Sequence, residues 1–224
     1  MKSYLYPITA LVWKDILLEL RTKDTLVSTL VFSLLIIIIF NFALEPIPQI
    51  VGFVAPGILW VAILLSGMLG VTRSFALEKD DSNIRGLMLV PVSRDAIFFG
   101  KMISSFTLMM LVEVLVFPAF AVLFNIKLLE PLLIPTAILA TLGIATLGTL
   151  FSAMALNTKA REVMLPLLFL PAAVPILISA VETTTSILTD TRIGDLWVWL
   201  PLLAAFDGIF LVICPIAFHL IAEE

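Results

Sequence analysis

Two carboxyl groups are the residues of this sequence whose position could support membrane chemistry, because each lies inside a long apolar stretch. Glu113 lies in the middle of residues 102–124, and Asp207 lies near the middle of residues 197–222. An ionised acid at the centre of a bilayer costs about 2.5–3.5 kcal/mol on insertion scales, so each should face the protein interior or a wet cavity, or be protonated. Two interpretations stay open: a translocation or proton path, and a hydrogen-bonded helix contact within the chain or across a dimer.

The sequence contains few residues that could support nucleotide binding or metal binding. The sequence has no Walker A loop, since its one Gly-Lys pair, Gly100 and Lys101, is followed by Met102 and lacks the upstream glycine. It holds one histidine, His219, and one cysteine, Cys214, so a metal site within one chain would need carboxylates alone. We therefore predict no catalytic, metal-binding or covalently bound cofactor residues, and no enzyme activity.

The elements that must position the two acids are membrane helices. Hydrophobic residues make up 61% of the 224-residue chain and charged residues 13%, against roughly 45–50% and 25% in globular proteins. Six apolar stretches, each close to the roughly 20 residues that cross a bilayer as a helix, contain only two of the 30 charged residues. The stretches are 26–44, 51–72, 102–124, 131–156, 163–181 and 197–222. The sequence predicts an all-α, polytopic membrane protein with a six-helix domain over 26–222.

The orientation follows from the basic residues between the stretches. The leader, the 73–101 segment and the 157–162 segment together carry eleven Lys and Arg residues, whereas the alternate segments carry two. The positive-inside rule therefore predicts that both termini are cytoplasmic.

The leader, residues 1–25, is expected to form an amphipathic helix before the first span. Its apolar residues recur at helical spacing on one arc, namely Val12, Trp13, Ile16, Leu17 and Leu20. Its charged residues lie mostly on the opposite side, namely Lys14, Asp15, Glu19 and Arg21. This pattern is typical of a helix in the cytoplasmic interface; the alternative is a lead-in without a partner.

The fourth and fifth spans contain residue patterns that indicate how each helix packs or bends. The fourth span has small residues at strict four-residue spacing, namely Ala137, Thr141, Ala145, Thr149 and Ala153, which is typical of helices in close contact in lipid. The fifth span contains Pro166, Pro171 and Pro175, so we expect it to be kinked or broken.

The segment 73–101 joins an acidic patch to a short apolar run that ends at Pro91. A short amphipathic helix presented to the cytoplasm would suit docking into a groove of another protein; the alternative is a solvated connector. The predicted docking residues are Glu78, Asp80, Asp81, Ile84, Arg85, Leu87, Met88, Leu89 and Pro91.

Several of these segments together resemble a known family. These are Lys14 followed by Asp15, the string Ala-Pro-Gly-Ile-Leu-Trp-Val-Ala over 55–62, the run 87–91, and Gly100 followed by Lys101. In these four segments the chain resembles the haem exporter protein B family, the ABC-type permease subunits of cytochrome c maturation. The resemblance covers essentially the whole chain, and Ala55, Pro56, Gly57 and Trp60 are its most specific part. The segment departs from the family pattern Asp-Gly-Ser/Thr-Leu-Glu, because Asp81 is followed by Ser-Asn-Ile-Arg.

The resemblance implies a permease dimer in the cell inner membrane, bound to two copies of a cytoplasmic ABC ATPase and to other haem-handling membrane subunits. ATP would act through that partner, with motion transmitted by the 73–91 segment. The work done would be haem export or release of a haem-loaded periplasmic chaperone, so haem would be handled by the complex.

Three alternatives remain at this point. The chain could be an ABC-2-type permease that exports a lipid, glycan or drug. It could be a proton-coupled carrier or intramembrane enzyme that uses Glu113 and Asp207, which would act without any ATPase. It could also be a purely structural assembly subunit.

Overall fold

The computed structural model describes residues 2–44, 50–80, 93–126, 130–156, 161–189 and 193–221, and the regular structure in these ranges is helical. The helices are α1 (Lys2–Thr22), α2 (Asp24–Leu44), α3 (Val51–Asp80), α5 (Arg94–Phe124), α6 (Leu133–Leu156), α7 (Arg161–Thr189) and α8 (Ile193–Ile221). Six of these described helices, all except α1, are long and apolar enough to cross a membrane. The predicted all-α, multi-pass fold is confirmed.

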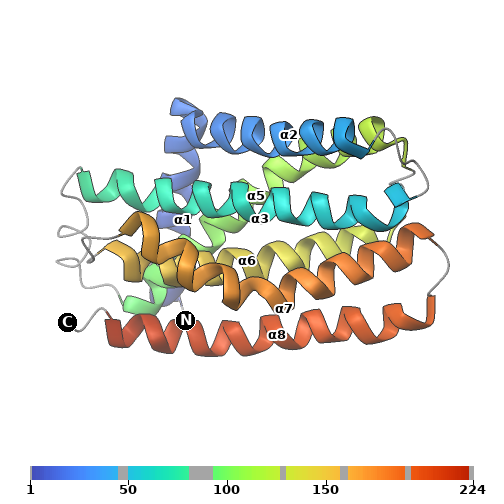
Figure 1. Ribbon diagram of the computed structural model, residues 1–224. Coiled ribbons are helices and arrows are strands. Elements are labelled where there is room, and N and C mark those ends of the chain that lie inside the picture. Colours follow the sequence, from blue (N-terminus) through green and yellow to red (C-terminus); the bar gives the residue numbers. More distant parts are fainter. Residues whose placement is uncertain are drawn as a thin grey trace.

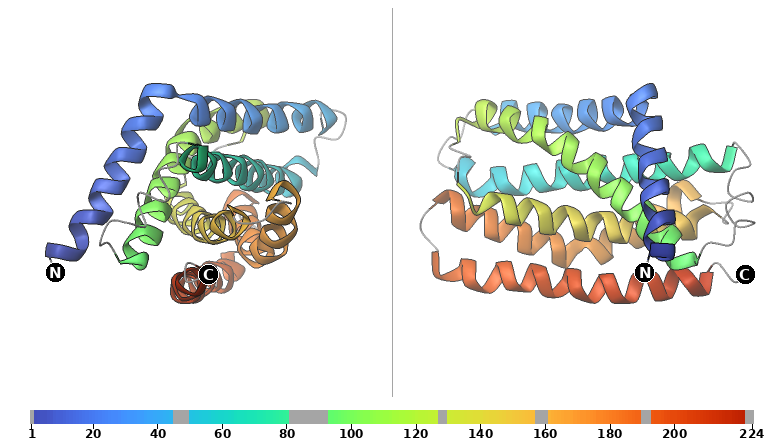
Figure 2. Two further views of the ribbon diagram at one scale, coloured as in Figure 1. Left: turned by 90° about the vertical axis from the view of Figure 1, so that its left-hand side faces the viewer. Right: turned by 180° about the vertical axis from the view of Figure 1, so that it is seen from behind.

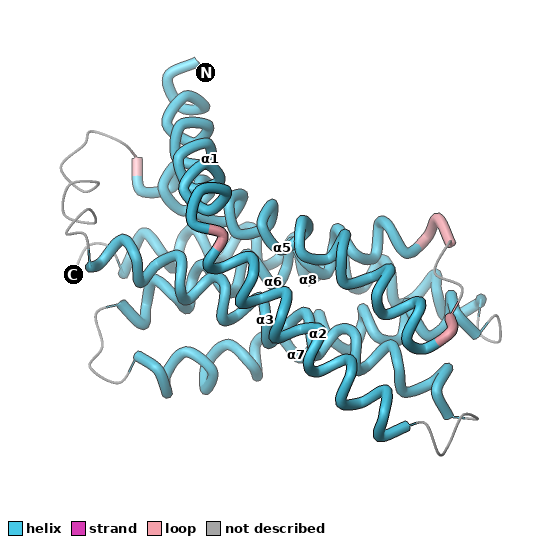
Figure 3. The backbone as a smooth tube through the Cα atoms, turned by 90° about the horizontal axis from the view of Figure 1, so that it is seen from above, coloured by secondary structure: helices cyan, strands magenta, loops and turns pink. Residues whose placement is uncertain are grey.

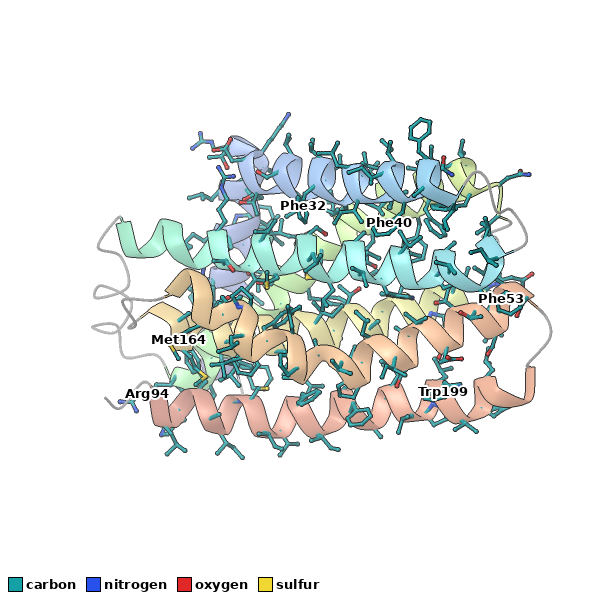
Figure 4. The ribbon with its side chains drawn as sticks, viewed as in Figure 1. Phe32, Phe40, Phe53, Arg94, Met164 and Trp199 are labelled. Atoms are coloured by element: carbon teal, nitrogen blue, oxygen red, sulfur yellow. The ribbon has the colours of Figure 1, made fainter. Side chains whose placement is uncertain are left out.

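The six long helices run side by side in alternating directions, so the start of α2 and the end of α8 lie at the same end of the bundle (Figure 1). Helix α1 lies across this end, steeply inclined to the other helices (Figures 2 and 3). We call this the α1 end. Arg94 and Met164 lie toward it, whereas Phe53 and Trp199 lie toward the opposite end (Figure 4).

Helix α6 is the centre of the bundle, because it packs against α3, α5, α7 and α8. All five small residues that the sequence placed on one face of this helix are buried, namely Ala137, Thr141, Ala145, Thr149 and Ala153. Lipid tails are as apolar as Leu, so helices associate in a bilayer through close packing of small side chains and not through hydrophobic exclusion. The predicted packing face is confirmed.

Helix α2 turns a mostly polar face inward and exposes apolar side chains. Its buried face carries Thr25, Thr29, Ser33 and Ile37 at four-residue spacing, while Val27, Val31, Leu35 and Ile39 are exposed. This arrangement suits a helix whose outer side meets hydrocarbon. Two of the inward hydroxyls bond to the helix backbone: Thr29 Oγ1 donates to the Thr25 carbonyl oxygen at 2.8 Å, and Ser33 Oγ donates to the Leu30 carbonyl oxygen at 2.9 Å.

Several helices are longer than the predicted spans. Helix α3 continues to Asp80, α5 begins at Arg94 and α7 runs to Thr189, so both flanks of the 73–101 segment are helical. Hydropathy measures the length that suits hydrocarbon, whereas a helix continues past that length until a residue stops its hydrogen bonding. Helix α7 is continuous through its three prolines and changes direction along its length (Figure 1), as expected for a proline-kinked helix.

The close contact of α6 with α7 and α8 depends on Gly143. A Cβ atom at this position would press on Asp207 Oδ1 and Ile176 Cδ1. We expect Gly143→Ala to lower the free energy of unfolding by about 1–3 kcal/mol, the usual cost of overpacking, in denaturant titrations of the protein in detergent micelles. Gly208→Ala is the control, because a Cβ there meets nothing within 4 Å. Equal stability of the two variants would contradict this account of the contact.

Candidate functional site

The candidate site is the junction where α1 meets the start of α5. The face of α1 that packs inward carries Ile8, Leu11, Asp15 and Glu19, all buried, whereas Trp13 on the opposite arc is 69% exposed. Helix α1 therefore presents its apolar arc outward and two carboxylates to the protein. The apolar arc that the sequence predicted for this helix is therefore its outer face, and the buried Asp15 and Glu19 contact the neighbouring helices.

A buried ion pair joins α1 to α5. Lys101 Nζ lies 2.9 Å from Asp15 Oδ2, and the two residues are only 2% and 8% exposed. Asp15 Oδ2 has no aligned hydrogen bond, so the contact is an attraction between charges. Lys14 Nζ approaches the other oxygen, Oδ1, at 3.2 Å from the surface. One carboxylate thus lies between two ammonium groups, one of them in the interior.

Gly100 lets the two helices come this close. A Cβ at Gly100 would lie 3.1 Å from both Cβ and Cδ1 of Leu11 on α1. The Gly100 and Lys101 pair therefore forms a docking point for α1. The glycine supplies the close approach and the lysine supplies the charge that fixes the position of Asp15.

The start of α5 also contacts the end of α8. The rings of Phe98 and Phe218 lie 5.4 Å apart between centroids, and Arg94 Nη1 donates to the His219 carbonyl oxygen at 3.4 Å. The first turns of α5 are therefore held from two sides, by α1 and by α8.

The joint between α1 and α2 is short and well defined. Lys23, the single residue between the two helices, adopts a left-handed conformation with φ of 59°. Glu19 Oε1 accepts a hydrogen bond from the Leu26 backbone N–H at 2.8 Å, which satisfies one of the free donors at the start of α2. The last residues of α1 thus cap the first membrane helix.

The start of α2 is in turn tied to α3. Arg73 Nη2 lies 3.6 Å from Asp24 Oδ2, and Arg73 Nη1 donates to Ser28 Oγ at 2.8 Å. The Asp24 ion pair is exposed and contributes little energy. Together with the contacts of α1 with α5 and α2 and of α5 with α8, it links these five helices at the α1 end.

The two intramembrane acids do not form one site. Glu113 on α5 is 3% exposed, and its Oε1 accepts a hydrogen bond from Thr141 Oγ1 on α6 at 2.5 Å. Asp207 on α8 is equally buried and packs at Gly143 on α6. Because residues two apart point to opposite sides of a helix with 3.6 residues per turn, the acids approach α6 from opposite sides. A single reaction centre that uses both carboxylates is not supported by this geometry.

The residues of the Ala-Pro-Gly string pack in the other half of α3. Ala55 and Pro56 are buried, and Trp60 Nε1 donates to Thr184 Oγ1 on α7 at 2.8 Å. The Trp60 ring also meets Phe117 of α5 edge to face, with centroids 6.2 Å apart. Gly57 is half-buried, and a Cβ there would meet nothing within 4 Å. The tryptophan therefore ties α3 to both α5 and α7.

The predicted docking residues lie mostly outside the part of the chain that the structure describes. Glu78 and Asp80 belong to the last turns of α3. The residues outside the described ranges are Asp81, Ile84, Arg85, Leu87, Met88, Leu89 and Pro91. Of the predicted leader residues, Lys14 and Arg21 are exposed and Asp15 and Glu19 are buried. The sequence interpretation missed Lys101 as the partner of Asp15, because the two positions are far apart along the chain.

The Asp15–Lys101 pair generates a stability prediction. Lys101→Met leaves Asp15 buried without its interior partner, so we expect it to lower the free energy of unfolding by about 3 kcal/mol, the low end of the range for breaking a buried pair, since Lys14 remains. Lys14→Met is the control and should cost about 1 kcal/mol or less, as for exposed pairs. The double variant Asp15→Leu with Lys101→Met should recover most of the loss in denaturant titrations. Equal costs for the two single lysine variants would argue against the pair.

Comparison with known proteins places the chain in a family. The profile of the family described as CcmB protein matches residues 7–222. A protein named Heme exporter protein B from Rhodobacter capsulatus is 32% identical over 174 residues, covering 77% of this chain and 80% of that protein. Two further proteins of the same name also match. The one from Haemophilus influenzae is 29% identical and covers 75% of this chain and 76% of that protein. The one from Pseudomonas aeruginosa is 26% identical and covers 88% of this chain and 87% of that protein. The chain belongs to the CcmB protein family.

Proposed function

We propose that this chain is the permease subunit of an ATP-driven haem-export machinery that serves cytochrome c maturation. The family match over residues 7–222 is the observation that carries this proposal, together with relatives that bear the name Heme exporter protein B. The sequence contains no Walker A loop, so ATP hydrolysis belongs to a separate cytoplasmic subunit. A second copy of the chain and two copies of that ATPase complete the core of the proposed machine.

In this proposal both termini and the α1 end face the cytoplasm of a cell inner membrane. The segments rich in Lys and Arg are the leader, 73–101 and 157–162, and they adjoin helix termini at the α1 end (Figure 1). This grouping supports the orientation because basic segments remain on the cytoplasmic side. Helix α1 then lies along the inner interface, with the exposed Trp13 arc directed to the lipid.

We assign force transmission to the ends of α3 and α5, which flank the proposed ATPase-docking segment. A displacement of that segment by the ATPase would move α5 directly, because α5 begins at its end, at Arg94. The Asp15–Lys101 pair would transmit the movement from α5 to α1. The Glu19 cap and Lys23 then pass it to α2. The junction thus provides a mechanical route from a cytoplasmic motor to the membrane helices.

The proposed work is release of a haem-loaded periplasmic chaperone, with haem-handling membrane partners, and not passage of haem through this subunit. The sequence has a single histidine and no pair of histidines to ligate haem iron. Within the described helices, the cleft beside Glu113 is narrow enough to suit water. Both observations favour a mechanical role.

The docking segment can be tested by removing its apolar contacts. We expect Leu87→Asp with Leu89→Asp to release the ATPase from the complex, because two buried charges would oppose insertion into a partner groove. Copurification from native membranes, with each partner identified by mass spectrometry, measures the loss. Asn83→Ser in the same segment is the control and should keep the ATPase. Retention of the ATPase by the double variant at wild-type stoichiometry would rule out this docking assignment.

The orientation can be tested with single cysteines in a Cys214→Ala background. Ser93 precedes α5 at the α1 end and Glu130 precedes α6 at the opposite end, and both are exposed. A membrane-impermeant maleimide should label Ser93→Cys only from the cytoplasmic side and Glu130→Cys only from the outside, in inverted vesicles and spheroplasts respectively. The reverse pattern would overturn the proposed orientation.

A further inference from the structure

A narrow cleft between α2, α3 and α5 has no role in the proposed function. Its polar wall consists of hydroxyl side chains from all three helices, namely Thr25, Thr29, Ser66, Ser74 and Ser105. Glu113 also lines the cleft, and the space is large enough for water. Thr25 and Ser74 lie near the α1 end of their helices, so the cleft extends from that end toward the buried carboxyl group.

The hydroxyls on this wall can accept hydrogen bonds from whatever enters. Thr29 Oγ1 donates to the Thr25 carbonyl oxygen at 2.8 Å, and Ser66 Oγ donates to the Ile63 carbonyl oxygen at 3.1 Å. A hydroxyl that has used its proton in this way still offers lone pairs. The buried Thr25 Oγ1 has no hydrogen-bond partner within the protein. The wall therefore combines acceptors with one hydroxyl that can either donate or accept.

Glu113 presents one oxygen for such a partner. Its Oε1 is occupied by Thr141, but its buried Oε2 has no hydrogen-bond partner within the protein. Helix α6 contributes no charged residue to its surroundings, and Asp207 lies on the other side of α6. On the remaining packed helices, Asp24 of α2 is paired with Arg73 of α3, and Lys101 of α5 lies beside Asp15. Among the described residues that line the cleft, Glu113 is the one ionisable group.

We propose that Glu113 is a proton-binding site that exchanges its proton with water in the cleft, reached from the α1 end of the bundle. A hydrated proton passes to Oε2, so the carboxylate becomes a neutral carboxyl group and one water molecule is released; the reverse step returns the proton to water. The neutral form removes the cost of a charge at membrane depth. The ligand is a proton because the space admits water and the carboxylate of Glu113 is the only charge among the described lining residues.

Infrared spectroscopy of the full-length chain in lipid nanodiscs tests the site without using export activity, so its outcome is separate from that of the proposed function. We expect a carboxyl C=O band that disappears as pH rises and that shifts promptly in D2O. Glu113→Gln should remove this band, whereas Asp207→Asn, which changes a buried acid outside the cleft, should keep it. Thr29→Val preserves the side-chain shape and should slow the exchange with D2O.

A second measurement holds even if Glu113→Gln fails to fold. Replacing the glutamate side-chain carboxyl carbons with 13C lowers the frequency of glutamate C=O bands and leaves aspartate bands in place. In the wild-type chain, the pH-dependent band should shift with this label, and it should lie at a higher frequency than the bands of exposed glutamates because its surroundings are apolar. Absence of such a glutamate band in the folded wild-type chain would overturn the proposal, as would a Glu113 band that does not respond to D2O.

Discussion

The structure depends on one constraint: hydrocarbon offers no hydrogen-bond partner, so a polar group at membrane depth is stabilised by facing the protein interior. Helix α2 follows this constraint by turning Thr25, Thr29 and Ser33 inward and exposing apolar side chains such as Val27 and Val31. Trp60 meets it through Thr184 on α7. Bonds between helices add specificity, because the Trp60–Thr184 bond and the Thr141–Glu113 bond form only when α3 meets α7 and α5 meets α6 in this arrangement.

At the α1 end, polar contacts add to the apolar packing between the helices. Asp15 and Lys101 fix α1 against α5, and Glu19 caps α2. A buried ion pair adds little net stability, but removing one partner is costly, so such a pair serves mainly to select one arrangement. The junction therefore fits a role in which helix positions must change together.

The sequence predicted the number of spans, the packing face of α6 and the bend in α7, since length, small-residue spacing and proline content are local signals. It did not predict where α3 ends or where α5 begins, both outside the apolar stretches, because hydropathy does not register hydrogen bonding beyond the membrane. It also could not pair Asp15 with Lys101 or separate Glu113 from Asp207. These relations depend on which way each helix is rotated about its axis, and an all-round apolar helix carries little information about rotation.

The single left-handed residue between α1 and α2 has a consequence for the response of the protein to its lipid environment. A thicker bilayer makes a spanning helix stand more upright. With only Lys23 between them, α2 has no slack to tilt independently of α1, so such a change would displace α1 relative to α5 and strain the Asp15–Lys101 contact. Bilayer thickness is thereby coupled mechanically to the charge pair that joins α1 to α5.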